Sequence, residues 1–166
     1  MKRLEKTIFV LCLLVFTIYT TGCSKKDFYP ASDIQITEVS PSNILPTSND
    51  FSSIDDGVIT MQLLNSIPCE LVSYDISYRT VFNEPIDGIA LNDLAANVPL
   101  AESGSSAELT LKPYSQQLLN LFETTSSNIS PVKATVTLHF KDVNKNETTR
   151  TASFLLYKYT EESSTE

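Results

Sequence analysis

The chain has 166 residues and carries 12 Lys and Arg, 20 Asp and Glu, three Cys, one His and no Trp. Its length is typical of a single domain. Charged residues make up 19% of the chain and hydrophobic residues 42%, a balance that excludes a disordered acidic tail, a coiled coil and a polytopic membrane protein.

The N-terminus has the pattern of an export signal. A basic start that includes Lys2 and Arg3 precedes an apolar run of 13 residues over 7–19. Because a spanning helix needs about 20 apolar residues, this run is too short to cross a bilayer and is typical of a secretory signal. It leads into the sequence Thr-Thr-Gly-Cys, which ends at Cys23.

Gly22 and Cys23 resemble the lipobox of bacterial lipoproteins, in which a small residue directly precedes an invariant Cys; Thr20 stands where that family usually has Leu. The resemblance covers the N-terminal signal and its cleavage point only. It implies that residues 1–22 are a signal peptide cleaved between Gly22 and Cys23. A diacylglycerol is then expected on the Cys23 sulfur and an acyl chain such as palmitate on its amino group. Several acyl chains on one residue make membrane attachment effectively permanent, whereas a single chain holds a protein only marginally.

The same resemblance implies a location. In some bacteria an Asp directly after the lipidated Cys favours retention in the inner membrane, and this chain has Ser24 there. We therefore expect a lipoprotein of the outer membrane that faces the periplasm or the cell surface and contacts the membrane through its anchor. No cofactor is expected besides the covalent diacylglycerol and N-acyl chain on Cys23.

Loss of the signal leaves a strongly acidic chain. Cleavage removes three basic residues and one acidic residue, so that 9 of the 12 basic and 19 of the 20 acidic side chains remain, a formal net charge of about −10. Nucleic-acid binding needs clustered Lys and Arg, and those that remain here are scattered. We therefore expect no nucleic-acid partner.

Alternation of apolar and polar residues predicts a β-rich domain over 34–160. We expect a lipidated Cys and polar tether over 23–33 before this domain and a disordered tail over 161–166 after it. Loops are expected over 38–56 and 92–106. The strands are expected over 34–37, 57–63, 71–82, 107–111, 132–141 and 149–159, with a further short one over 86–91.

Two of these strands have an apolar and a polar face that can be told apart in the sequence. In 71–82 the apolar face is expected to include Phe82 and the polar face Asp75, while in 132–141 the polar face includes His139. Past residue 113 the apolar residues recur at i, i+4, i+7 and i+8, which predicts a short amphipathic helix that crosses between sheets.

Seven or so short strands with turn signals between them predict an all-β fold, an antiparallel β-sandwich with one short crossover helix. In outline the domain resembles an immunoglobulin-like or fibronectin-type sandwich. The paired Cys and core Trp of true immunoglobulin domains are missing, so this resemblance rests on the strand pattern alone.

The sequence contains few candidates for chemistry. One His excludes a His-pair metal site, and neither a G-x-S-x-G motif nor a Gly-rich phosphate loop occurs. Cys69 is the only thiol expected to stay free in the exported chain, and we expect it to be buried and inert because no basic residue lies close to it in sequence. The oxygen-rich stretch over 142–146 lacks the Gly and the bidentate Glu of a calcium loop and predicts a hairpin turn. We therefore expect no catalytic residue, no metal site and no enzymatic activity.

Tyr157 and Tyr159 alternate with Lys158 near the end of the last strand. Aromatic residues at a sheet edge can bind a sugar ring or a partner strand, and packing within the domain is the alternative interpretation. The sequence thus predicts a non-catalytic, lipid-anchored domain that binds or assembles with an envelope protein at the membrane surface, with Tyr157 and Tyr159 as the candidate ligand or partner surface. The alternative is a glycan-binding module of the cell surface that uses the same two tyrosines.

Overall fold

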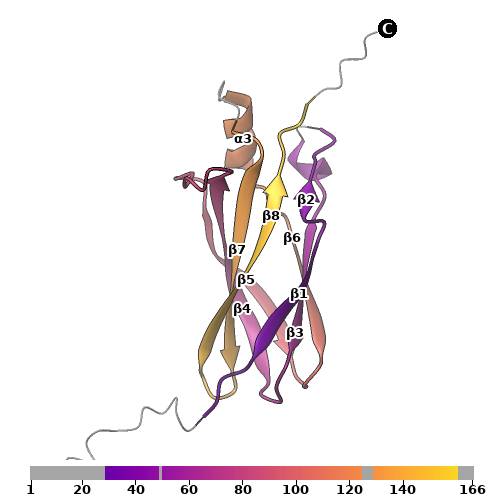
Figure 1. Cartoon of the computed structure of the whole chain (residues 1–166), viewed down its shortest axis with the longest axis vertical. Coiled ribbons are helices and arrows are strands. Elements are labelled where there is room, and N and C mark those ends of the chain that lie inside the picture. Colours follow the sequence, from indigo (N-terminus) through magenta and orange to yellow (C-terminus); the bar gives the residue numbers. More distant parts are fainter. Residues whose placement is uncertain (1–28, 49, 125–128, 161–166) are drawn as a thin grey trace, which may run out of the picture. The chain divides into compact units, whose positions relative to one another are not determined.

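The computed structural model describes residues 29–48, 50–124 and 129–160, and in this part of the chain eight strands form two sheets (Figure 1). One sheet has three antiparallel strands in the order β1-β3-β6, and the other has five strands in the order β2-β8-β7-β4-β5. Only β2 runs parallel to its neighbour, β8. The strands are β1 (Ile34–Ser40), β2 (Asn43–Ile44), β3 (Gly57–Leu63), β4 (Cys69–Thr80), β5 (Leu91–Leu100), β6 (Ser106–Leu111), β7 (Val132–Asp142) and β8 (Glu147–Leu156).

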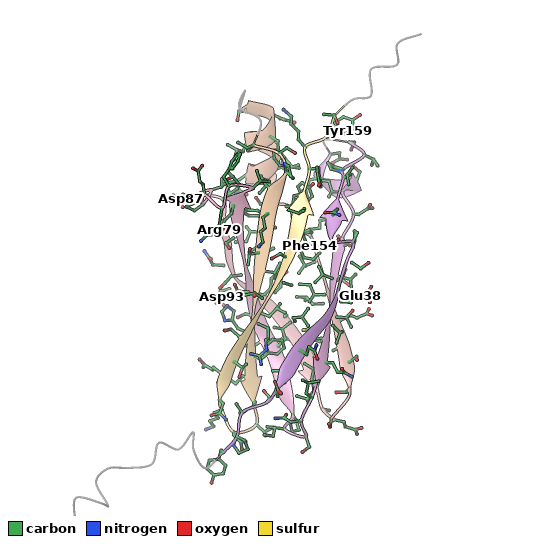
Figure 2. The ribbon with its side chains drawn as sticks, viewed as in Figure 1. Glu38, Arg79, Asp87, Asp93, Phe154 and Tyr159 are labelled. Atoms are coloured by element: carbon green, nitrogen blue, oxygen red, sulfur yellow. The ribbon has the colours of Figure 1, made fainter. Side chains whose placement is uncertain are left out.

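The hydrophobic core is built from both sheets. Alternate residues of β3 and of β7 are buried, as the alternation in their sequences predicts, and the β8 side chain Phe154 is fully buried among them. Figure 2 shows Phe154 on the inner side of its sheet. The prediction of an all-β domain is therefore confirmed, with a sandwich-like arrangement of two sheets around a shared core.

The predicted crossover helix is also confirmed. Helix α3 (Gln116–Thr124) connects β6 of the three-stranded sheet to β7 of the five-stranded sheet. The Ser115 hydroxyl accepts a hydrogen bond of 3.1 Å from the Leu118 N–H, which gives the first turn a side-chain cap. Leu118 and Phe122 bury the apolar stripe of the helix.

Strand β4 does not keep the uninterrupted alternation that its sequence suggests. The register against β7 shifts between Leu71 and Ser73, so Val72 is an extra residue and the buried positions change from odd to even numbers along the strand. The strand ends at Thr80 and the chain turns, so that Phe82 is 84% exposed. Our expectation that Phe82 belongs to the apolar face of the strand is therefore wrong.

The region after β4 also differs from the expectation. The predicted short strand over 86–91 is a turn region up to residue 90, and an isolated bridge between Arg79 and Pro85 precedes it. The predicted loop over 92–106 contains most of β5, which begins at Leu91. Asp93 and Asn97 have positive φ values of 54° and 57°, and the register against β4 is irregular at both. These bulges break the two-residue period, which is why the sequence pattern does not reveal the strand.

The expected loop over 38–56 contains further structure. The two-residue strand β2 pairs with the end of β8, and the 3₁₀ helix η1 (Phe51–Ser53) follows it. The hydroxyl oxygen of the buried Tyr114 lies 3.0 Å from the Ile44 carbonyl oxygen and 2.8 Å from the Tyr157 carbonyl oxygen. The hydroxyl can donate to only one of these carbonyls at a time. It holds β2 beside the residues that follow β8. Burial raises the pKa of Tyr114, which keeps the phenol protonated as a donor.

The chain enters the fold at Ala31, and we call the end of the domain where it does so the entry end. The Ala31 carbonyl accepts a hydrogen bond from the Asn65 side chain, and the N–H of the buried Ser32 donates one to Asp142. The turns β3–β4, β5–β6 and β7–β8 all lie at this end, as the strand pairings require. The β4–β5 turn and α3 lie at the opposite end, which we call the far end (Figure 1).

Candidate binding surface

A groove of about 580 Å³ lies on the outer face of the five-stranded sheet, and we call it the sheet groove. The outward-pointing residues of β4, β7 and β8 form its floor, since Ser73, His139 and Thr149 are neighbours across the three strands. Its polar lining residues are Ser73, Asp75, Asp93, His139, Lys141, Glu147, Thr148 and Thr149.

A carboxylate and an imidazole are held together in this groove. The Asp75 Oδ2 atom lies 2.8 Å from His139 Nε2, and the Asp75 Oδ1 atom accepts a 2.7 Å hydrogen bond from the Asp93 N–H. The bulge at Asp93, which is labelled in Figure 2, brings this N–H into reach. Asp75 therefore links three strands, β4, β5 and β7, through a single side chain.

Hydrogen bonding sets the charge of Asp75. The Asp93 N–H is the main cause that lowers the pKa of Asp75, and His139 adds to it, while partial burial acts in the opposite direction. Asp75 is therefore ionised at neutral pH and presents a fixed acceptor on the sheet face. Because both side chains of the pair are about one-third exposed, a ligand can reach them.

The groove offers hydrogen bonds from many directions. It combines carboxylates, an imidazole, an ammonium group and hydroxyls, which together can pair with the polar groups of a protein surface or of a sugar. Within the described part of the chain, no hydroxyl group is hydrogen-bonded to His139. Likewise, the described residues contain no group of three or more His, Cys, Asp or Glu side chains that could hold a metal ion.

The residues singled out in the sequence lie elsewhere. Gly22 and Cys23 fall outside the described residues. Strand β8 ends at Leu156, so the prediction that the last strand continues to Tyr159 is wrong. Tyr157 and Tyr159 follow this strand and are half-buried. The Tyr157 backbone is engaged at both its N–H and its carbonyl, by Ile44 and by Tyr114. Figure 2 shows Tyr159 at the far end of the domain.

The sheet groove contains neither of these tyrosines. The sequence places Asp75 and His139 on polar strand faces but gives no sign that the two side chains meet, because their contact depends on the register of β4 against β7. The role of Asp93 depends on a bulge in a strand that the sequence pattern misses. Two adjacent strands with clear polar faces are the only signal that could have directed attention to this surface.

Cys69 is buried at the start of β4, with 6% of its surface exposed, and burial raises the pKa of its thiol. A thiol in this setting is a weak nucleophile, as its sequence context predicts. It lines a second groove of about 410 Å³ at the entry end. Most of that groove is apolar, and its lining includes Pro68, Leu100 and Val143.

Comparison with known proteins does not assign the chain to a family. No family model matches the chain, and no curated protein matches it. A crystal structure of a provisionally named ApaA protein from Bordetella pertussis is 16% identical and superposes with a TM-score of 0.40, covering 79% of this chain and 97% of that one. A solution structure of a provisionally assigned late embryogenesis abundant protein is 14% identical, also with a TM-score of 0.40, and covers 95% and 89% of the two chains. Neither likeness identifies a function.

In the part of the chain that the structure describes, no helix combines the length and the apolar character that a bilayer crossing needs.

Proposed function

We propose that this chain is a lipid-anchored lipoprotein of the cell envelope, most simply of the outer membrane, whose β-domain binds or assembles with an envelope protein and catalyses no reaction. One observation carries the proposal: a basic start and a 13-residue apolar run lead through Thr20 and Thr21 to Gly22 and Cys23. The acidic mature chain, with a charge of about −10, supports a protein partner over nucleic acid.

We further infer that the domain is an immunoglobulin-like or fibronectin-type sandwich. The support is its strand order. If the two-residue β2 is set aside, β1, β3 and β6 form one sheet, and β8, β7, β4 and β5 form the other in that order. The first sheet corresponds to strands A, B and E of such folds, and the second corresponds to strands G, F, C and C′. Domains of this architecture commonly serve as binding modules at cell surfaces.

The sheet groove is the binding surface that we assign to this function. It lies on the broad face of the larger sheet, and its acceptor Asp75 is held in place by bonds from two other strands. Preorganised polar groups lose little freedom on binding, so they favour a specific partner.

Cys23→Ser should release the protein from membranes. The variant lacks the sulfur that would carry the diacylglycerol, so we expect the chain to move from the membrane pellet to the soluble fraction and to lose incorporation of labelled palmitate. Cys69→Ser is the matched control, because the buried Cys69 thiol is not an expected lipidation site, and this variant should stay in the pellet and keep its label. Retention of Cys23→Ser in the pellet would contradict the lipid anchor.

The partner surface is tested by photo-cross-linking in cells of the native host. A photoreactive residue at Thr149, which is exposed in the sheet groove, should capture one dominant envelope protein. The same residue at Glu108, exposed on the outer face of the other sheet, is the control and should capture it poorly. Equal capture at both positions would remove the sheet groove from the proposal.

The second candidate function is glycan binding, because the sheet groove is rich in groups that hydrogen-bond sugar hydroxyls. Retention of the purified domain on cell-surface polysaccharide would support it. Loss of retention in Asp75→Asn would assign the glycan to the sheet groove, and loss in Tyr159→Ala would assign it to the tyrosine pair. A domain that no polysaccharide retains would exclude this candidate.

A further inference from the structure

Two aliphatic side chains are exposed at the entry end. Val143, in the β7–β8 turn, is 67% exposed, and Leu64, directly after β3, is 46% exposed. The two turns are joined by a hydrogen bond from the Val143 N–H to the Pro68 carbonyl. Val143 also lines the apolar groove of about 410 Å³ at this end, so the apolar surface extends beyond two isolated side chains.

The chain reaches the domain at the same end. Ala31 is fixed beside the β3–β4 turn by its bond with Asn65, and the next residue, Ser32, is buried against Asp142. Only eight peptide steps separate Cys23 from Ala31. Because an extended chain covers at most about 3.3–3.6 Å per residue, a lipid on Cys23 keeps Ala31 within roughly 30 Å of the bilayer.

We propose that the entry end rests on the lipid surface, with the side chains of Val143 and Leu64 in contact with the outer part of the bilayer. This inference depends on the anchor at Cys23 that the proposed function includes. It also orients the domain, because the far end, with Phe82 in the β4–β5 turn, then faces away from the membrane.

Lipid is favoured over a protein as the occupant of this surface because the short tether presents the entry end to the bilayer at a high effective concentration, so that even a weak apolar contact with lipid can form. The acidic mature chain as a whole is not attracted to anionic lipid. The contact depends on the aliphatic side chains and should therefore form on vesicles of zwitterionic lipid.

The absence of Trp from the chain makes this contact measurable. Val143→Trp places one fluorophore at the entry end, and Phe82→Trp places one at the far end, each at an exposed position. The lipidated full-length variants are to be reconstituted in phosphatidylcholine vesicles whose acyl chains carry bromine, which quenches Trp on contact. We expect about a two-fold loss of emission for Val143→Trp, because interfacial side chains penetrate about 5–10 Å, and no loss for Phe82→Trp.

Flotation of the same vesicles separates the two proposals. If both variants float with the vesicles but the emission of Val143→Trp is unchanged, or falls no more than that of Phe82→Trp, the orientation is wrong while the anchor stands. If the protein takes up no labelled palmitate and does not float with the vesicles, the anchor itself fails. Equal thermal unfolding temperatures of the two variants and the parent confirm that neither Trp disturbs the fold.

Discussion

Gly57→Ala should destabilise the domain by about 1–3 kcal/mol or more, because it overfills a packed core. Gly57 begins β3, and a Cβ atom there would lie 2.5 Å from Cε1 and 2.7 Å from Cζ of Phe154 on β8, in the opposite sheet. The Phe154 ring is fully buried and cannot move into solvent. Urea unfolding followed by circular dichroism measures the loss as a lower midpoint at unchanged slope.

Phe154→Leu provides the control for this clash. Alone, it should also destabilise the domain, since it removes buried ring atoms. Combined with Gly57→Ala, the smaller side chain makes room for the new methyl group, so the double variant should be more stable than the sum of the single effects by about 1 kcal/mol. Strict additivity would show that the two residues do not compete for space.

Asp142→Asn should lower the free energy of unfolding by about 1–3 kcal/mol at neutral pH, because it removes a carboxylate that several donors surround. Asp142 is buried at the end of β7. Its oxygens accept hydrogen bonds from the N–H and side-chain amide of Asn146 and from the Ser32 N–H. The Asn variant presents an NH₂ group to at least one of these donors. Asp33→Asn, at an exposed carboxylate of the same end, should change stability by less than about 1 kcal/mol.

The pH dependence of Asp142 gives a second readout. Burial tends to raise its pKa, but the hydrogen bonds from Asn146, Ser32 and Asn144 outweigh burial and hold the pKa below the ordinary value of 3.8. The unfolded chain therefore takes up the proton first as the pH falls, so this stabilisation is complete above about pH 5 and is lost as the pH falls through the folded-state pKa. The difference in stability between parent and Asp142→Asn should shrink between pH 5 and pH 3. A difference that stays constant over this range would contradict the assignment.

The sequence predicts strands best where one face of the strand is buried without interruption. In β3 and β7, side chains alternate between core and solvent along the whole strand, so the two-residue period is visible in the sequence. In β4 one extra residue at Val72 reverses the alternation, and in β5 two bulges at Asp93 and Asn97 remove it. Bulges depend on pairing with a neighbouring strand and are therefore invisible to a periodicity analysis of one segment.

In the candidate site, too, the sequence predicts what depends on neighbouring residues but not what depends on the pairing of distant strands. That Asp75 and His139 point to solvent follows from local alternation. Their contact, across 64 positions of sequence, follows from the register of two strands that meet only in the folded domain. The lipid anchor, by contrast, depends on contiguous residues alone and stays a prediction from the sequence.

The irregular course of β5 bears on how neighbouring copies of the protein behave. This strand is the outer edge of the larger sheet, and it combines two residues in the left-handed region with Pro99, which has no N–H to donate. A flat edge strand with unpaired backbone N–H and C=O groups can pair with a strand of another copy and so extend the sheet. A bulged edge strand pairs poorly in this way. The lipid anchor that we propose would confine copies of the protein to the plane of a membrane, where they would meet sideways at high local density. Under that proposal, the bulges that hide β5 from sequence analysis would also keep this edge from extending into the sheet of a neighbouring copy.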